Sequence, residues 1–368
     1  MAITKIPFLV TKDMNSGELT QPTTIKDNNN KDVIRIYDSA PHAYDPEFDT
    51  LRTELSAGND ELGLISVLEL KRENLLSEAI KIGNINDTQL LIQLTQNMGA
   101  TSFTGAIIKG NDRFAYLLYG NFETKFSRYD MEKNTMLNLT DTPQTIIDGA
   151  GCYDGDDYIY VVRGNNNSDF LRYSIKNNNW SSMQALPVTG FGTTSLVYAG
   201  NDKIYAIIGN SAIGRFYEYS ISSNLWNKLV DLPIEARNGQ SMVYTGGDKI
   251  FVSLGSSSGV ENKKLYSYSI SLNTFTELND APENYNGTLV YTGANYIYVN
   301  RGFGTTTLYR YSINDNSWEL MTNMRYSMYY GSKYMIYGND GFLYCLQGNG
   351  TQIFFRLKIA VSNYQNWM

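Results

Sequence analysis

Short runs of apolar and aromatic residues, separated by polar turns, fill the chain from about residue 101 to its end. In one stretch, Ser195–Tyr198 and Lys203–Ile208 flank Ala199–Asp202, a turn whose residues accept a positive φ, so these segments predict a β-hairpin. Arg215–Ile221 and Trp226–Leu229 follow and are joined by a second polar turn. The pattern predicts four short antiparallel strands in succession.

This four-strand pattern recurs at a fixed period, which identifies the structural unit before any single residue is interpreted. A turn glycine marks each unit, and successive copies lie 45, 45, 46, 47 and 45 residues apart: Gly110, Gly155, Gly200, Gly246, Gly293 and Gly338. A tyrosine separated by six residues from a large aromatic residue marks the units independently, in Tyr173/Trp180, Tyr219/Trp226, Tyr268/Phe275 and Tyr311/Trp318. The chain is therefore expected to contain six units.

Four strands of this length cannot bury both faces of one small sheet, and stacking the units side by side supplies the missing core. Radial stacking closes the sheets into a ring without long free edges. The expected fold class is therefore all-β: a six-bladed β-propeller over residues 101–368, preceded by an extended arm and a short α-helical segment.

The period and the tyrosine–tryptophan spacing resemble those of the kelch repeats. One feature departs from the family pattern, because the paired glycines after the second strand are here a glycine and another residue: Gly164-Asn165, Gly209-Asn210, Gly255-Ser256, Gly302-Phe303 and Gly348-Asn349. The resemblance covers residues 101–368 and implies the propeller fold. It selects no function, because kelch propellers include enzymes, adaptors and carbohydrate-binding proteins.

Two segments precede the repeats. Residues 1–60 hold turn and breaker clusters around one expected strand, Val33–Tyr37, and are interpreted either as an attachment arm or as a tail packed on the propeller. Residues 61–100 are expected to form a helical stem or junction, because apolar side chains recur at helical spacing before the helix-stopping Gly83: Ile65, Leu68, Leu75, Ala79 and Ile82. The helix either joins identical chains, most simply as a homotrimer, or packs on its own propeller. Arg72 at a seam position favours the second alternative.

Two segments compete to supply the last strand of the ring. Gln89–Gln93 aligns with the fourth strand of a unit that would precede the first complete repeat, and Tyr364–Trp367 offers a fourth strand at the other end of the chain. The residues alone leave open which of the two closes the propeller.

Composition narrows the classes of partner. The formal net charge of −7, the pI of about 5.0 and the absence of a clustered basic run argue against nucleic acid. No stretch approaches membrane-spanning length and Ile6–Val10 is too short for a signal peptide, so no membrane insertion is expected. Cys152 and Cys345 occupy strands of different repeats and are interpreted as core thiols.

Residue types that carry catalysis or bind metals are scarce. The one histidine, His42, lies in the arm, which leaves none for a metal site or a Ser-His-Asp set within the repeats. Asp154–Asp157 aligns with the hairpin turns of other repeats and is interpreted as a turn rather than a calcium loop. Glu235 and Glu283 follow prolines at one repeat position, which makes them loop residues rather than a catalytic pair. No catalytic residue, metal site or cofactor is assigned.

The two faces of the expected propeller differ. In a four-strand antiparallel blade, the first and third connections share one face, where the turns are short and uniform. The second connections and the links between blades share the other face and vary in length and chemistry, which is where recognition usually lies. Aromatic and arginine side chains suit sugars and anionic groups, and the candidate ligand-binding residues on this face are Arg163, Phe191, Arg215, Arg237, Tyr285, Arg301, Phe303, Arg325 and Tyr326.

The order of arm, junction and propeller resembles modular bacteriophage receptor-binding proteins, which are commonly trimers. The resemblance implies a location in the virion tail, docking to other tail or baseplate proteins through residues 1–60, and binding of a bacterial cell-surface carbohydrate by the propeller. Two alternatives stay open. One is a carbohydrate enzyme similar to the kelch-type sialic-acid mutarotases, and the other is a cytoplasmic kelch module for protein interactions.

Overall fold

The computed structural model describes residues 23–26, 32–37, 50–54, 67–71, 91–93 and most of 105–359. Within that last range it leaves out residues 121, 165, 190–193, 210–214, 237–238, 256–261, 294, 322, 325, 330–332 and 349–352. The chain divides into two compact units, Met1–Thr88 and Gln89–Met368.

The first unit contains a four-stranded antiparallel sheet in the order β1-β2-β4-β3. Its strands are β1 (Thr23–Lys26), β2 (Asp32–Tyr37), β3 (Thr50–Glu54) and β4 (Val67–Lys71). Thus β2 contains the expected strand Val33–Tyr37, whereas Leu68 lies in β4 and not in a helix. Apolar and polar residues alternate from Leu68 to Lys71, which is the strand period. Ile65, Arg72, Leu75, Ala79 and Ile82 lie outside the described residues.

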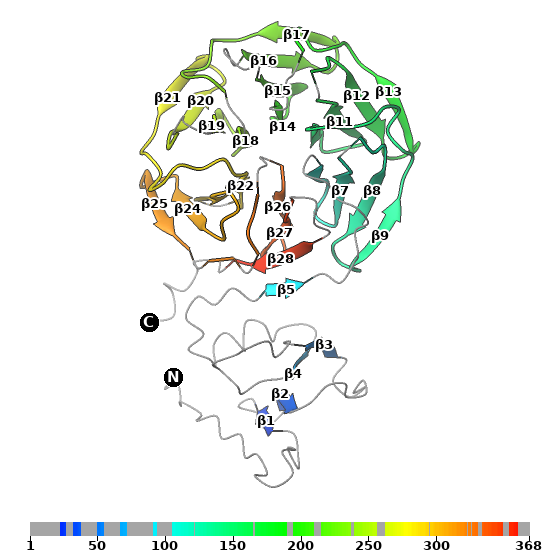
Figure 1. The fold of residues 1–368 in the computed structure, drawn as a ribbon, viewed down its shortest axis with the longest axis vertical. Coiled ribbons are helices and arrows are strands. Elements are labelled where there is room, and N and C mark those ends of the chain that lie inside the picture. The colour runs from blue at the N-terminus through cyan, green and yellow to red at the C-terminus, as the bar shows by residue number, and fades with distance from the viewer. Residues whose placement is uncertain are drawn as a thin grey trace. The chain divides into compact units, whose positions relative to one another are not determined.

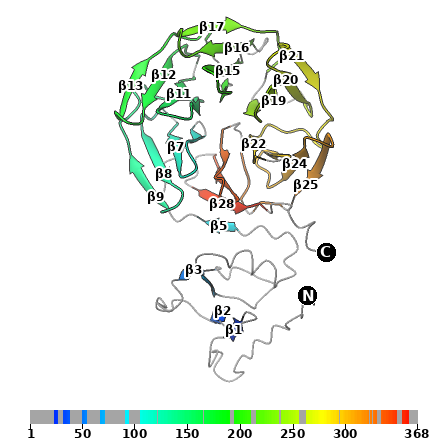
Figure 2. The ribbon, with the colours of Figure 1, turned by 180° about the vertical axis from the view of Figure 1, so that it is seen from behind.

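The second unit is a ring of six four-stranded antiparallel sheets, as expected from the repeat (Figures 1 and 2). Blades 1 and 2 comprise β6 (Ala106–Lys109), β7 (Phe114–Leu118), β8 (Phe126–Asp130), β9 (Thr135–Asn138), β10 (Ala150–Tyr153), β11 (Tyr158–Val162), β12 (Phe170–Ser174) and β13 (Asn179–Ser182). Blades 3 and 4 comprise β14 (Thr194–Tyr198), β15 (Lys203–Ile208), β16 (Arg215–Ser220), β17 (Leu225–Lys228), β18 (Ser241–Tyr244), β19 (Lys249–Ser253), β20 (Leu265–Ser269) and β21 (Thr274–Glu277). Blades 5 and 6 comprise β22 (Leu289–Tyr291), β23 (Tyr296–Asn300), β24 (Leu308–Ser312), β25 (Ser317–Leu320), β26 (Met335–Tyr337), β27 (Phe342–Leu346), β28 (Phe354–Lys358) and β5 (Leu91–Gln93).

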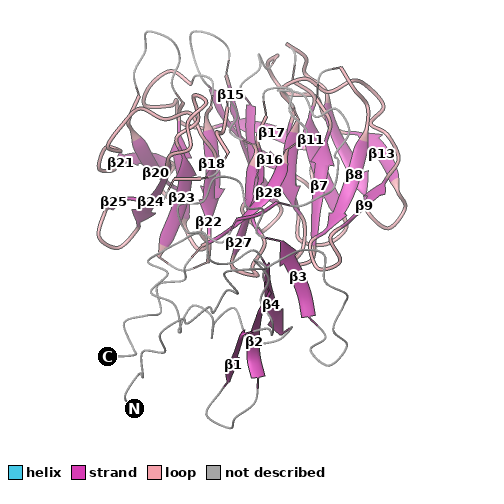
Figure 3. Ribbon diagram, turned by 60° about the horizontal axis from the view of Figure 1, so that its bottom comes forward, coloured by secondary structure: helices cyan, strands magenta, loops and turns pink. Residues whose placement is uncertain are grey.

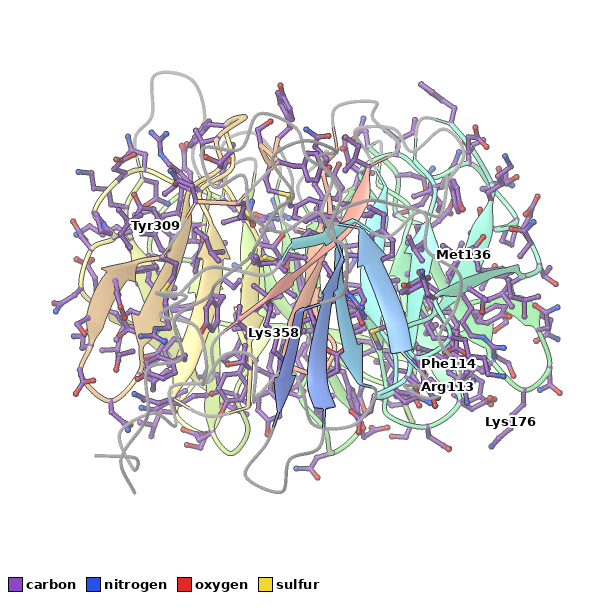
Figure 4. The ribbon with its side chains drawn as sticks, turned by 90° about the horizontal axis from the view of Figure 1, so that it is seen from below. Arg113, Phe114, Met136, Lys176, Tyr309 and Lys358 are labelled. Carbon is purple, nitrogen blue, oxygen red and sulfur yellow. The ribbon has the colours of Figure 1, made fainter. Side chains whose placement is uncertain are left out.

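Each blade begins with an inner strand beside the central axis and ends with an outer strand on the perimeter (Figures 1 and 3). We call the face that carries the first and third connections the turn face, and the face that carries the second connections and the inter-blade links the loop face. Arg113 and Lys176, which belong to a first and a third connection, lie toward one edge of the ring in Figure 4, and Tyr309 lies toward the other. The first connections are uniform, each four residues long, from 110–113 in blade 1 to 338–341 in blade 6.

The tyrosine–tryptophan pairs of blades 2, 3 and 5 each join their blade to the one before it. In blade 3 the Tyr219 hydroxyl donates to Asn224 Oδ1 at 2.6 Å, and the same oxygen accepts the backbone N–H of Gln184 at 2.8 Å. Trp226 Nε1 donates to the carbonyl oxygen of Gln184 at 3.0 Å. The backbone N–H and carbonyl groups of Gln184, which lies in the link between blades 2 and 3, are therefore both hydrogen-bonded by blade 3. Trp180 and Trp318 bind Thr140 and Asn279 in the same way.

The core lies between blades. Tyr160, Phe170 and Tyr219 pack with Trp226 at the junction of blades 2 and 3, where the Phe170 and Trp226 rings are 5.0 Å apart. Trp180 and Trp318 pack at the corresponding junctions. The tryptophans occupy equivalent sites, as predicted, but they are half-buried because each indole N–H reaches outward to the link that it binds.

The N-terminal segment closes the ring. β5 is the outermost strand of blade 6 and pairs antiparallel with β28, with Leu91 opposite Leu357 and Gln93 opposite Phe355. This resolves the choice between Gln89–Gln93 and the C-terminus, and the residues around Tyr364 lie outside the described part of the chain. The compact propeller unit begins at Gln89, before the expected boundary at residue 101, because β5 belongs to it.

Substitution of Asn224 tests the junction between blades 2 and 3. Asn224 has φ 55° and accepts two hydrogen bonds, so Asn224→Gly removes the bonds without strain and should cost about 1–3 kcal/mol. Asn224→Ala should cost about 1 kcal/mol more, because alanine disfavours the left-handed backbone. Urea unfolding of both variants measures the loss of unfolding free energy in each. Equal midpoints for all three proteins would contradict the role assigned to this side chain.

Two shortened chains test closure by β5. The chain 89–368 keeps β5 and should unfold cooperatively, whereas the chain 101–368 leaves the edge of β28 open and should melt at a lower temperature and self-associate. Thermal unfolding followed by circular dichroism and light scattering distinguishes them. Indistinguishable midpoints and masses would show that β5 is dispensable.

Candidate functional site

The turn face is braced by short-range hydrogen bonds. Asp157 of the first connection in blade 2 accepts from Ser174 Oγ and from the backbone N–H of Lys176, both at 2.8 Å. Asp202 and Asp248 make the equivalent contacts in blades 3 and 4. Asp154–Asp157 is therefore a hairpin turn, and these carboxylates are already used within the fold.

Two of the predicted arginines on the loop face, Arg163 and Arg301, are each paired with a carboxylate of their own. Arg163 Nε donates to the Thr145 carbonyl oxygen at 2.8 Å and Nη1 lies 3.2 Å from Asp169, with 19% of the side chain exposed. Arg301 pairs with Glu283 at 2.7 Å, which accounts for one of the two glutamates considered as a catalytic pair. Arg215 begins β16 and is half-buried. A ligand anion would have to compete with Asp169 for Arg163 and with Glu283 for Arg301.

The predicted aromatic residues divide between core and surface. Tyr285 is 1% exposed, and its hydroxyl donates to the Lys264 carbonyl oxygen at 3.0 Å, so it supports the core and presents no surface to a ligand. Phe303 is half-buried at φ 54°, with the Arg301 guanidinium 5.9 Å from its ring, and Tyr326 packs on Phe355. Phe191, Arg237 and Arg325 lie outside the described residues.

The loop-face end of the central axis carries residues outside the predicted set. Six equivalent positions, each four residues before the end of an inner strand, surround it. We call them the mouth ring: Gly105, Gly149, Thr194, Gln240, Gly287 and Lys333. Five members are small or neutral, and Lys333 is the charged one.

Lys333 joins three blades. Its carbonyl oxygen accepts the backbone N–H of Ile107 in blade 1 at 2.9 Å, and its Nζ donates to the carbonyl oxygen of Asp148, just before blade 2, at 2.6 Å. Burial lowers the pKa of Lys333 to about 8, although the Asp148 charge opposes the shift. Burial likewise raises the pKa of Asp148, which Lys333 opposes. The mouth therefore holds two partly desolvated, opposite charges.

A shallow crevice adjoins Lys333 between blades 1 and 6. Its volume is about 280 Å³, including space open to solvent, and its walls are Gly105, Leu117, Leu118, Tyr119, Tyr334, Leu346 and Gly348. Gly348 has φ 75°, and a Cβ there would lie 3.1 Å from the Tyr334 ring. The enclosed part has room for about one water molecule, so a larger ligand would rest on this surface and not enter it.

Phe122 stands on the same side of the ring, in the second connection of blade 1. Its side chain is 66% exposed and its backbone has φ 65°, a conformation that bulky residues rarely adopt. The equivalent positions in blades 2 and 5 hold Asn166 (φ 55°) and Gly304 (φ 71°), residues that suit this backbone. Phe122 therefore departs from the local preference of the repeat while exposing a large apolar ring.

Repeat alignment could have found both residues. Aligned on Gly120, Gly164 and Gly302, Phe122 stands where blade 2 has asparagine and blade 5 has glycine. Lys333 likewise stands where the other inner strands have neutral residues. Side-chain type alone does not identify these two residues, because what distinguishes them is their departure from the repeat.

Metal and membrane features were also sought in the described part of the chain. Among its residues, no group of three or more histidine, cysteine, aspartate or glutamate side chains could hold a metal ion. The same residues contain no apolar helix of membrane-spanning length. Cys152 and Cys345 are buried and reduced, as expected for core thiols.

Comparison with known proteins supports the fold and not a function. No protein-family model and no curated protein sequence matches this chain. Among solved structures, the one titled "Structure of YjhT" is similar with a TM-score of 0.59 and 13% identity, covering 73% of this chain and 98% of that one. At this identity the likeness shows the propeller architecture alone. In all, 1204 solved chains match, so the architecture does not discriminate among functions.

Proposed function

We propose that the loop face of this propeller binds a bacterial cell-surface carbohydrate, as the receptor-binding part of a bacteriophage tail protein. The observation that carries the proposal is Phe122, an exposed aromatic side chain held at a backbone conformation that favours asparagine or glycine. Strained residues persist where the side chain has a use that the fold alone does not require.

The chemistry of the surrounding surface fits a sugar. An exposed aromatic ring such as Phe122 stacks against the C–H face of a pyranose, and Gly105 and Gly348 beside blade 1 permit close approach of a ligand. A shallow surface gives a weak single site. Several copies on one particle would raise the effective concentration without any new contact.

The direction of the chain at β5 agrees with such a role. Leu91 lies opposite Leu357, toward the turn-face end of β28, and Gln93 lies opposite Phe355, toward the loop-face end. The preceding chain therefore enters the propeller from the turn-face side. At its entry into β5 the chain thus lies on the side of the propeller opposite the loop face.

We further propose that the first unit docks to other tail or baseplate proteins and joins the chains as a homotrimer. The motive is a separate compact unit, with its own four-stranded sheet, ahead of the propeller. Light scattering should give three chains for the full protein and one for the chain 89–368. A monomeric full-length protein would remove the trimer from the proposal.

Phe122→Asn tests glycan binding without loss of stability. Asparagine occupies the equivalent position in blade 2, so the variant should melt at the same temperature as the original protein or slightly above it. Its binding to an array of bacterial surface oligosaccharides should fall about tenfold or more, because the stacking ring is lost.

Leu272→Asn is the matched control. Leu272 is 72% exposed in a third connection of blade 4, on the turn face, so this change also removes an exposed apolar side chain but should leave binding intact. Equal loss in both variants would indicate general stickiness. Unchanged binding by Phe122→Asn would locate recognition elsewhere, and turnover of a sugar would favour the enzyme alternative.

A further inference from the structure

The mouth ring is neutral except at one point. Gly105, Gly149 and Gly287 project no side chain, and the other neutral members, Thr194 and Gln240, are buried at 1% and 0% exposure. Lys333 is half-buried and remains open to solvent. A ligand lying at the loop-face end of the central axis therefore meets one positive charge at a defined place.

The position of that charge is set by the fold. The Lys333 backbone is held by Ile107 and its Nζ by the carbonyl oxygen of Asp148, so one residue spans blades 6, 1 and 2. An ammonium group carries three N–H donors. Within the described chain, the hydrogen bond to Asp148 uses one of them, and no carboxylate lies within ion-pair distance of Nζ. Among the described residues, none accepts a hydrogen bond from the remaining donors.

We propose that Lys333 forms a subsite for an oxyanion, a carboxylate or a phosphate, carried by the glycan that the loop face binds. The inference rests on the proposed carbohydrate binding and specifies the charge class of the ligand. The oxyanion accepts charge-assisted hydrogen bonds from Nζ while the sugar ring lies over the adjoining surface beside Gly348.

The electrostatics of the mouth support an anionic ligand at this position. Partial burial disfavours the charged form of Lys333 and lowers its pKa although Asp148 opposes the shift, so an arriving oxyanion adds a second negative charge that favours the charged form. Asp148 acts in the opposite sense, because its carboxylate repels the ligand. Removing the Lys333 charge should therefore weaken binding of an acidic ligand, and removing the Asp148 charge should strengthen it. A purely structural role for Lys333 does not predict these opposite changes.

The experiment compares an oligogalacturonate with the same oligomer after reduction of its carboxyl groups, with a glycerol-phosphate oligomer as the phosphate arm. The full chain should bind one of the acidic oligomers about tenfold more tightly than the neutral one, measured by titration calorimetry. Lys333→Met should remove this preference, and Lys333→Arg should retain it. Asp148→Asn keeps the backbone acceptor, tolerates φ 53°, and should strengthen acidic binding several-fold.

Each outcome separates this inference from the proposed function. Equal binding of acidic and neutral oligomers, lost in Phe122→Asn, would overturn the subsite and leave carbohydrate binding in place. No binding of these oligomers or of the oligosaccharide array would overturn both. If Lys333→Met melts at a lower temperature, Asp148→Asn still tests the subsite. Unchanged or weaker binding of the acidic oligomers by Asp148→Asn would contradict it.

Discussion

The ring depends on how one blade satisfies the backbone of its neighbour. Where a link leaves an outer strand, a residue such as Gln184 presents both an N–H and a carbonyl group at the junction. Asn224 accepts the first and Trp226 donates to the second, while Tyr219 holds the asparagine in place. Unsatisfied backbone groups at such a junction would cost free energy, and the same three side chains recur in blades 2 and 5.

This bracing explains the difference between the faces. On the turn face, Asp157, Asp202 and Asp248 repeat one pattern of contacts, and a substitution there disturbs the brace of its own blade. The second connections and links take no part in that pattern and are free to differ. Residues that depart from the repeat, such as Phe122 and Lys333, are therefore found on the loop face, where the fold places the fewest constraints on residue type.

The period and the tyrosine–tryptophan spacing were enough to predict the blades, because each unit repeats the same packing problem. Ring closure was not decided, since Leu91–Gln93 is too short and too far from the repeats to identify its partner β28. The expected helix failed at Leu68, where the alternation of β4 competes with helical spacing over a few residues. Candidate arginines such as Arg163 and Arg301 were visible as residue types, but their carboxylate partners are neighbours only in the folded chain.

Closure by β5 also sets an order of events during synthesis. Leu91 emerges from the ribosome long before Leu357, its partner in blade 6, so the first strand of the propeller waits unmatched while five blades form. Contacts this distant in sequence carry the largest loop-closure entropy and form late in folding. A chain interrupted before β28 leaves the ring open, with the edge of β5 exposed. The ring can therefore close only after β28 has been synthesised.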